Sequence, residues 1–308
     1  GANDSLALKS ANVGLSISSQ VDATEDGSNL EAQNAAVPSI AAPFSTPISS
    51  IAAVPMLLCE GRAALATSII AFRYMLLYGV IQFTSEMLLF IHFVNMTDLE
   101  FLWQDLVVAF PLVVTMEFTG SARKITKGLP ETRLLSWPFL NAVIASVLLT
   151  SGTQALVYMW LISQSWYDRP VAEENTNMES TTLFLFGTSQ LISTNLALAH
   201  TYGGVRLPVW SNRPLVVNLT IIVILHSLLY IFLFVEPIKS EFEAVWLPLS
   251  FRVQLYLATL ANAAALIVYE RCCVSHTMNL GDGARHSSKE QKKVYMGPQD
   301  HELSNEVL

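Results

Sequence analysis

The sequence predicts a membrane domain built entirely from helices, with six spans, preceded by the end of a soluble α/β domain. Of the 308 residues, 52% are hydrophobic and 14% are charged, whereas a soluble domain carries about 25% charged residues. Six apolar segments are each long enough to cross a bilayer, which takes about 20 helical residues. The first 60 residues differ from the rest because they are polar and interrupted by proline.

The N-terminal unit, residues 1–60, is expected to lie outside the membrane. Residues 3–11 are expected to form a short helix, and residues 13–17 alternate apolar and small side chains as a strand does. Residues 18–36 are polar and acidic, which indicates a flexible loop. The prolines that follow, up to Pro55, indicate an extended or broken connector.

The transmembrane domain is expected to occupy residues 61–271. The first of its spans is longer than a bilayer requires, and Arg62 and Arg73 fall in its early part. We therefore expect that end to form a stalk in the aqueous phase or interface. Residues 272–308 are polar and are expected to form a disordered cytosolic tail. The predicted spans are residues 64–93, 99–118, 137–163, 181–199, 214–235 and 251–269.

The charges of the loops orient the predicted bundle. The loop after the second span carries four basic residues, and the loop after the fourth carries Arg206 and Arg213. The loops on the opposite side are mainly acidic. The positive-inside rule places the basic loops in the cytosol. Both ends of the chain are then cytosolic, in agreement with an even number of spans.

Several functional classes find no support in the sequence. No basic stripe interleaved with aromatic residues indicates binding to nucleic acid. No second histidine or carboxylate lies at metal-ligand spacing from His226, so we expect no metal site in the bundle. No Ser/His/Asp or Cys/His arrangement indicates a nucleophilic enzyme.

Polar residues in the first two spans are the strongest candidates for binding a ligand. Asp105 lies in the second span, nine residues after Met96, and Glu86 lies ten residues before Met96, where the turn is expected. Both carboxylates are therefore expected about 14–15 Å below the outer surface, near mid-bilayer. Four residues of the first span share one helical face because they recur at every fourth position: Tyr74, Tyr78, Gln82 and Glu86.

A carboxylate within a span costs about 2.5–3.5 kcal/mol on insertion scales, so it normally faces a cavity or a partner. No lysine or arginine accompanies Glu86 and Asp105 in sequence, which favours a cationic ligand. The alternative is a protonated side chain that bonds to a neighbouring helix. Other polar residues within the spans are expected to bond between helices: Asn141, Gln154, Gln190, Asn195, Asn218, His226, Gln254 and Asn262.

The chain begins with Gly1-Ala2-Asn3-Asp4, a glycine-containing turn ahead of a predicted helix. Such a turn offers backbone N–H groups to a phosphate, and a nearby carboxylate can hold Mg²⁺. An ordinary helix N-cap accounts for Asn3 and Asp4 as well. Because the chain starts inside this turn and without methionine, we expect it to be the back end of a longer protein.

These residues together resemble a known family. Gly1–Asp4, followed by Ala7–Lys9 and Val13-Gly14, is similar to the hinge motif that closes the phosphorylation domain of P-type ATPases. The close resemblance covers about residues 1–120, and beyond it only the number and lengths of the spans agree. Four further stretches resemble the type V (B branch) P-type ATPases, the polyamine-transporting group of endolysosomes and vacuoles: Ala41–Thr46; Glu60–Leu65 with Thr67-Ser68; Tyr74-Met75 with Tyr78 and Gln82-Phe83; and Asp98-Leu99 with Phe101-Leu102 and Asp105-Leu106.

The resemblance implies where the chemistry resides. It implies a HAD-like phosphorylation domain that ends within residues 1–60, followed by the fifth to tenth helices of a ten-helix core. It makes Asp4 a ligand of Mg²⁺ and Asn3 its neighbour on the phosphate side. It makes Tyr78 and Gln82 contacts of the polyamine and Asp105 an acidic ligand for an amine. The phosphorylated aspartate and the ATP site would lie outside this chain, which alone is not expected to hydrolyse ATP.

Two residues depart from the family pattern. Arg73 stands where the family has lysine, and Glu86 stands where an apolar residue is expected. An additional carboxylate facing the channel would favour a more highly charged amine or change the substrate. The acidic loops on the lumenal side would raise the local concentration of a polycation.

The function implied is that of an ATP-driven pump, acting through a phospho-aspartate. It would move a polyamine or another cation across an internal membrane, endolysosomal or vacuolar. Its partners would be membrane lipid and the remaining N-terminal part of the pump. Three alternatives stay open: a P-type pump for metal cations, a six-span channel or carrier without an ATP step, and a membrane interaction protein from a truncated gene.

Overall fold

A computed structural model describes residues 5–17, 42–46, 48, 50–123, 125, 130, 133–169 and 177–274. The chain divides into two units, Gly1–Gly61 and Arg62–Leu308, and each is described by itself. The predictions for Asn3, Asp4 and the acidic loop 18–36 lie outside the described residues, as does the predicted tail from residue 275 onward.

The first unit contains a short helix and a small parallel sheet. Helix α1 (Ser5–Ser10) and strand β1 (Leu15–Ile17) confirm the predicted helix and strand. Strand β2 (Phe44–Thr46) pairs with β1 in parallel, with Leu15 opposite Phe44. The sequence analysis assigned β2 to the connector, because three residues between two prolines are too few to show the alternation of apolar and small side chains that indicates a strand. The pairing with β1 makes it a strand.

Six helical segments in the described part of the chain are long and apolar enough to cross a membrane. They confirm the six predicted spans and the membrane bundle. The first begins earlier than predicted, because Pro55 lies in the first turn of helix α3 (Ala53–Leu89), where a missing N–H breaks no helical bond. The segments are Ala53–His92, Asp98–Met116, Trp137–Ile162, Met178–Ala199, Arg213–Phe232 and Leu249–Val274. Two short helices, η4 (Val209–Ser211) and α9 (Ile238–Glu241), lie between spans.

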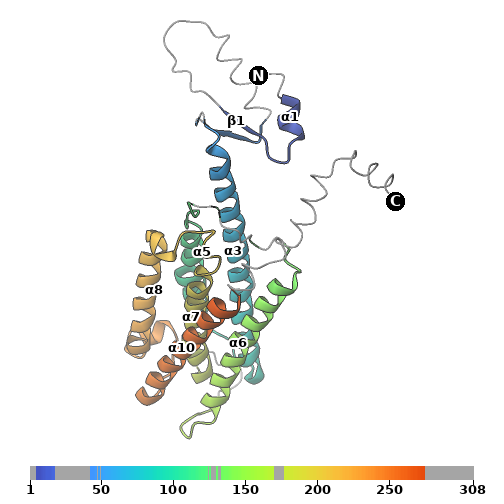
Figure 1. Cartoon of the computed structure of the whole chain (residues 1–308). Coiled ribbons are helices and arrows are strands. Elements are labelled where there is room, and N and C mark those ends of the chain that lie inside the picture. The colour runs from blue at the N-terminus through green and yellow to red at the C-terminus, as the bar shows by residue number, and fades with distance from the viewer. Residues whose placement is uncertain are drawn as a thin grey trace, which may run out of the picture. The chain divides into compact units, whose positions relative to one another are not determined.

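Helix α7 (Met178–Ala199) lies at the centre of the bundle (Figure 1). Its most apolar window is 83% buried, whereas the corresponding windows of the other five segments are 28–39% buried. Serine, threonine and glycine are frequent along α7, and small residues let neighbouring helices approach closely. It contacts α5 (Phe110–Met116), α6 (Trp137–Ile162), α8 (Arg213–Phe232) and α10 (Leu249–Tyr269).

The second span changes its helical geometry in the middle. Helix α4 (Asp98–Leu102) continues as the π-helix η3 (Trp103–Ala109) and then as α5. The N–H of Phe110 donates to the carbonyl of Asp105, five residues back. Pro111 follows, and in a regular α-helix its ring would clash with the carbonyl four residues earlier. The wider π turn removes this conflict, and such turns occur frequently at functional sites.

A buried ion pair joins the first span to the last. Arg73 of α3 is fully buried, and its guanidinium donates to both carboxylate oxygens of Glu270. Glu270 begins the π-helix η5 (Glu270–Val274) and also accepts a bond from Thr201 Oγ1 at 3.2 Å. The expected stalk in the aqueous phase or interface did not include this burial of Arg73 against another helix. Its partner is 197 residues away, beyond the reach of any local pattern.

Arg206 is a second buried arginine, and the charges of the loops did not predict its burial. It is 4% exposed, and its Nη2 donates to the carbonyl of Met116 at 3.0 Å, at the C-terminal end of α5. Burial lowers the pKa of Arg206 to about 10, so the side chain is still charged at neutral pH. A cation at this end of a helix satisfies free carbonyls and complements the helix dipole.

The Arg73–Glu270 pair leads to a stability prediction. Glu270→Ala leaves the Arg73 charge buried without its carboxylate and is expected to destabilise the bundle by about 3–5 kcal/mol. The matched control is Glu236→Ala, because Glu236 is exposed and lies 3.8 Å from Lys239 Nζ. That change should cost less than about 1 kcal/mol. Thermal unfolding of both variants in detergent tests this, and equal transition temperatures would contradict it.

Candidate functional site

Asp105 lies where the first two spans meet. Its Oδ1 accepts a hydrogen bond from the Tyr78 hydroxyl at 2.7 Å and another from Gln82 Nε2 at 2.6 Å. Tyr78 and Gln82 are one helical turn apart on α3, so both reach the π-helix η3. The structure therefore brings together three of the predicted binding residues.

The carboxylate of Asp105 has donors but no counter-charge. Among the described residues, no lysine or arginine forms an ion pair with Asp105, and no hydrogen bond reaches Oδ2. Both neighbours donate to Oδ1, so the carboxylate is the acceptor in both bonds. The side chain is half-buried, so a ligand can approach. An ionised carboxylate with an available oxygen is suited to a cation.

Gln104 holds Gln82 in position, a role that the sequence analysis did not predict. Gln82 Nε2 lies 3.4 Å from Gln104 Oε1, while Gln104 Nε2 donates to Thr188 Oγ1 of α7 at 3.2 Å. Gln104 is almost fully buried. The sequence could have indicated this role only through the position of Gln104 next to Asp105. On a regular helix, however, adjacent residues point about 100° apart, so they are not expected to serve one site. The amide of Gln82 is thus held between the site and the central helix.

Gly187 allows polar side chains from three helices to meet on α7. A Cβ at this position would lie 3.4 Å from Ser85 Oγ, 3.5 Å from Gln154 Nε2 and 3.7 Å from Gln104 Nε2. Gln154 Nε2 in turn donates to Gln190 Oε1 at 2.8 Å. A polar layer therefore continues from the Asp105 site into the middle of the bundle.

Most of the predicted bonds between helices are confirmed. Asn262 accepts from Thr153 Oγ1 at 3.2 Å, Asn218 donates to Thr115 Oγ1 at 3.1 Å, and His226 lies 2.8 Å from Ser189 Oγ. Two of the residues, Asn141 and Gln254, are exposed instead. No group of three or more His, Cys, Asp or Glu residues that could hold a metal occurs in the described part of the chain. The residues whose bonds confirm the prediction are Gln154, Gln190, Asn195, Asn218, His226 and Asn262.

Glu86 does not lie where its distance in sequence from the turn suggested. Its Oε1 accepts a bond from the backbone N–H of Met96 at 3.4 Å, so it lies beside the turn and not about 14 Å below it. The reason is that α3 ends at Leu89 and continues only through the 3₁₀ turn η2 (Phe90–His92). Phe93 then takes a left-handed conformation, with φ of 57°, and the chain folds back along the helix. Glu86 and Asp105 therefore do not share one depth.

The sequence analysis also did not identify two buried acidic residues near this turn, Glu100 and Glu179. Glu100 accepts bonds from the Thr97 backbone and from the Ser180 hydroxyl. The Thr-x-x-Glu spacing is the signature of a helix capping box, and it could have identified Glu100 from the sequence. Glu179 is fully buried and accepts from the Tyr167 hydroxyl, with His92 Nδ1 at 2.7 Å. Both carboxylates are almost completely buried, whereas Asp105 is half-buried.

Comparison with known proteins gives relatives of one kind. The human protein named polyamine-transporting ATPase 13A3 is 29% identical over 96% of this chain and 25% of its own length. The mouse polyamine-transporting ATPase 13A2 is 36% identical over 72% of this chain and 18% of its own length. The vacuolar cation-transporting ATPase YPK9 of Saccharomyces cerevisiae is 33% identical over 83% of this chain and 17% of its own length. No protein-family model matches the chain. The chain spans about a quarter of these relatives' length or less.

The packing around Gly187 leads to a prediction. Gly187→Ala should be tolerated, because the added methyl group meets its neighbours at ordinary contact distances. Gly187→Leu should displace Gln104 and Gln154 and destabilise the bundle by about 1–3 kcal/mol. Gly152→Leu on α6 is the control, since a Cβ there meets nothing within 4 Å. Thermal unfolding in detergent compares the three variants, and a Gly187→Leu protein as stable as Gly152→Leu would contradict the proposed convergence.

Proposed function

The chain belongs to the type V (B branch) P-type ATPases, and from this we propose that it forms the substrate-binding membrane bundle of a cation pump. The substrate that the site supports best is a polyamine. The observation that carries this proposal is Asp105, a half-buried carboxylate held by Tyr78 and Gln82 with no counter-charge from the described residues. The names of the human and mouse relatives agree with such a substrate.

The geometry gives each residue a role in binding an ammonium group. Oδ2 of Asp105 would accept a charge-assisted N–H bond, which is about twice as strong as a neutral one. Tyr78 and Gln82 would hold the other carboxylate oxygen and so fix the direction in which Oδ2 points. The ring of Tyr78 would offer a cation–π face. Gln104 would keep Gln82 in place through its contact with α7.

Glu86 is proposed to bind a second ammonium group of the same substrate. It lies one turn beyond Gln82 on α3, about 6 Å further along the axis, and nearer to the turn between the spans. A polyamine carries several positive charges along a flexible chain, so one molecule can reach both carboxylates. The departure from the family pattern at Glu86 would then select for substrates with more charges.

The ATP-driven part of the cycle is proposed from the resemblance. Asp4 would contribute to a Mg²⁺ site with Asn3 on the phosphate side, and the phosphorylated aspartate and nucleotide site would lie in the rest of the pump. A HAD-like fold for residues 1–60 is supported by α1 and the parallel pair β1 and β2. Helix α3, 37 residues and about 55 Å long, would pass movement into the bundle, since a bilayer core needs only about 30 Å.

The chain is a multi-pass membrane protein, and its location and orientation are part of the proposal. The name of the yeast relative supports a vacuolar or endolysosomal membrane. The basic loops after the second and fourth spans support cytosolic ends. For that orientation we propose movement of the polyamine from the lumen to the cytosol. Transport of a metal cation is less well supported, because soft metals are bound by clusters of cysteine or histidine. The described residues contain no such cluster.

Asp105 provides the direct test. In the full-length pump, Asp105→Asn should raise the KM for polyamine-stimulated ATP hydrolysis about 10- to 100-fold, because a charged hydrogen bond contributes about 1.5–3 kcal/mol. Asp98→Asn is the control, since this exposed acid begins the same span. Stimulation of Asp105→Asn with the wild-type KM would overturn the assigned site.

Glu86 leads to a prediction about substrate choice. Glu86→Gln should raise the KM for a tetra-amine such as spermine and leave the KM for a diamine such as putrescine nearly unchanged. The reason is that only the longer, more highly charged molecule would use both carboxylates. ATPase measurements with both amines test this, and equal effects on the two would contradict a second ammonium subsite.

A further inference from the structure

A histidine and a buried carboxylate join the end of the first span to the central helix. His92 is the last residue of the 3₁₀ turn η2, and Glu179 lies in the first turn of α7. His92 Nδ1 is 2.7 Å from Glu179 Oε1. Directly after His92, the chain takes the left-handed conformation at Phe93 and reverses toward the second span. The His92–Glu179 pair therefore holds this reversal against α7.

The carboxylate of Glu179 has no permanent counter-charge among the described residues. It is fully buried, and its Oε1 accepts from the hydroxyls of Tyr167 and Tyr158, the latter at 3.4 Å. Oε2 has no hydrogen-bond partner in the part of the chain that the structure describes. Arg169 is exposed and forms no ion pair with this carboxylate. Because a buried charge is costly unless it is paired, a protonated His92 is the group positioned to neutralise Glu179.

The imidazole of His92 is accessible to protons from water. Its side chain is 19% exposed, and it lines a cavity of about 520 Å³ together with Tyr158, Tyr167 and Arg169. Nδ1 faces a carboxylate and therefore carries a hydrogen, so an added proton goes to Nε2. No described residue forms a hydrogen bond with Nε2. The charge of His92 can therefore change while its bond to Glu179 stays in place.

We infer that the His92–Glu179 pair is a pH-sensitive contact between the first span and α7, strong in acid and weaker as the pH rises. Histidine is the side chain whose charge ordinarily changes between pH 5 and 8. In acid, the bond from the charged imidazole is charge-assisted, about twice as strong as a neutral one. As the pH rises, the imidazole loses its charge and this additional strength is lost. The proposed orientation places the pair in the lumen, where acid would keep it charged, but the contact itself does not depend on that proposal.

The other polar groups around the pair do not account for such an effect. Tyrosine and arginine do not ordinarily change charge between pH 5 and 8, which excludes Tyr158, Tyr167 and Arg169. Glu100 of α4 accepts a bond from the hydroxyl of Ser180 on α7. Protonation of Glu100 would weaken that bond in acid, which is the opposite direction.

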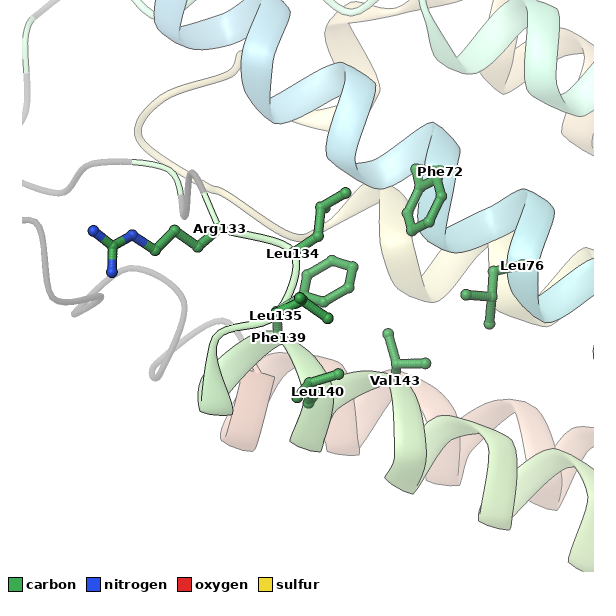
Figure 2. Close-up of a pocket in the computed structure, with 8 residues that line it drawn as sticks. All are labelled: Phe72, Leu76, Arg133, Leu134, Leu135, Phe139, Leu140 and Val143. Carbon is green, nitrogen blue, oxygen red and sulfur yellow. The ribbon is translucent and has the colours of Figure 1, made fainter.

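Closer to the N-terminal end of α3, its contact with α6 is apolar. Figure 2 shows Phe72 and Leu76 on α3 facing Val143 on α6. The rings of Phe72 and Phe139 are 6.2 Å apart between their centres. These side chains bind no proton, so this contact does not depend on pH. The effect of pH is therefore expected at the reversal after His92.

Hydrogen–deuterium exchange of the full-length pump in detergent tests the inference, at about pH 5.5 and about pH 7.5, on either side of the ordinary titration of histidine. The readout is the peptide that ends at Val94, because the N–H groups of Phe93 and Val94 donate to backbone carbonyls, which do not titrate. After correction for the intrinsic pH dependence of exchange, this peptide should exchange about tenfold more slowly in acid, the effect of a charged rather than a neutral hydrogen bond. His92→Gln should remove the difference and give the faster rate at both pH values.

Two further variants separate the pair from other titrating groups. His200→Gln removes another half-buried histidine, whose Nδ1 lies 2.9 Å from the carbonyl of Leu196, and it should keep the difference. Glu179→Gln removes the charge of the acceptor and should abolish the difference with His92 in place. Equal exchange of the wild-type peptide at both pH values would overturn the inference. A difference that persists in His92→Gln or Glu179→Gln, or that is lost in His200→Gln, would overturn it as well. None of these readouts requires ATP hydrolysis, so they are independent of the proposed pump activity.

Discussion

The two hydrogen bonds from Tyr78 and Gln82 to Asp105 Oδ1 fix the relative position of the first two spans. Asp105 lies in the π-helix η3, where the second span widens ahead of Pro111. Gln82 is also close to Gln104, which binds Thr188 of α7. One carboxylate therefore connects the hairpin to the central helix. Lipid offers no hydrogen bonds, so such contacts inside the bundle select a single arrangement of the helices.

The other buried acids of the bundle show why Asp105 is distinctive. Glu270 is neutralised by Arg73, Glu179 accepts from a tyrosine hydroxyl and pairs with a histidine, and Glu100 accepts from backbone and hydroxyl groups. These three carboxylates are almost completely buried, so a ligand has little access to them. Asp105 is half-buried and, within the described part of the chain, has only neutral donors on one oxygen. The site therefore combines an incompletely satisfied negative charge with access, and a cationic ligand supplies what the protein does not.

Helix α7 shows how a polar composition becomes a structural centre. Its mean hydropathy of 1.2 is the lowest among the six membrane segments, yet it is the most buried. Several serine and threonine hydroxyls on it bond to its own backbone or to neighbouring helices, as Thr188 does with Phe184 and Gln104. Gly187 provides the space in which Gln104 and Gln154 approach it. Polar atoms facing lipid would have no partners, whereas at the centre they hold the other helices together.

The sequence by itself determined the number of spans, their approximate limits and the face that carries Tyr78 and Gln82. These properties follow from length and from a period of 3.6 residues, which are local. It also singled out Asp105, because a carboxylate in an apolar segment is conspicuous in any fold. Only the tertiary structure decided that Arg73 is buried against Glu270 and that Glu86 lies beside the turn. It also decided which span is central. These outcomes depend on contacts between residues far apart in sequence and on how the chain reverses, and neither leaves a periodic pattern.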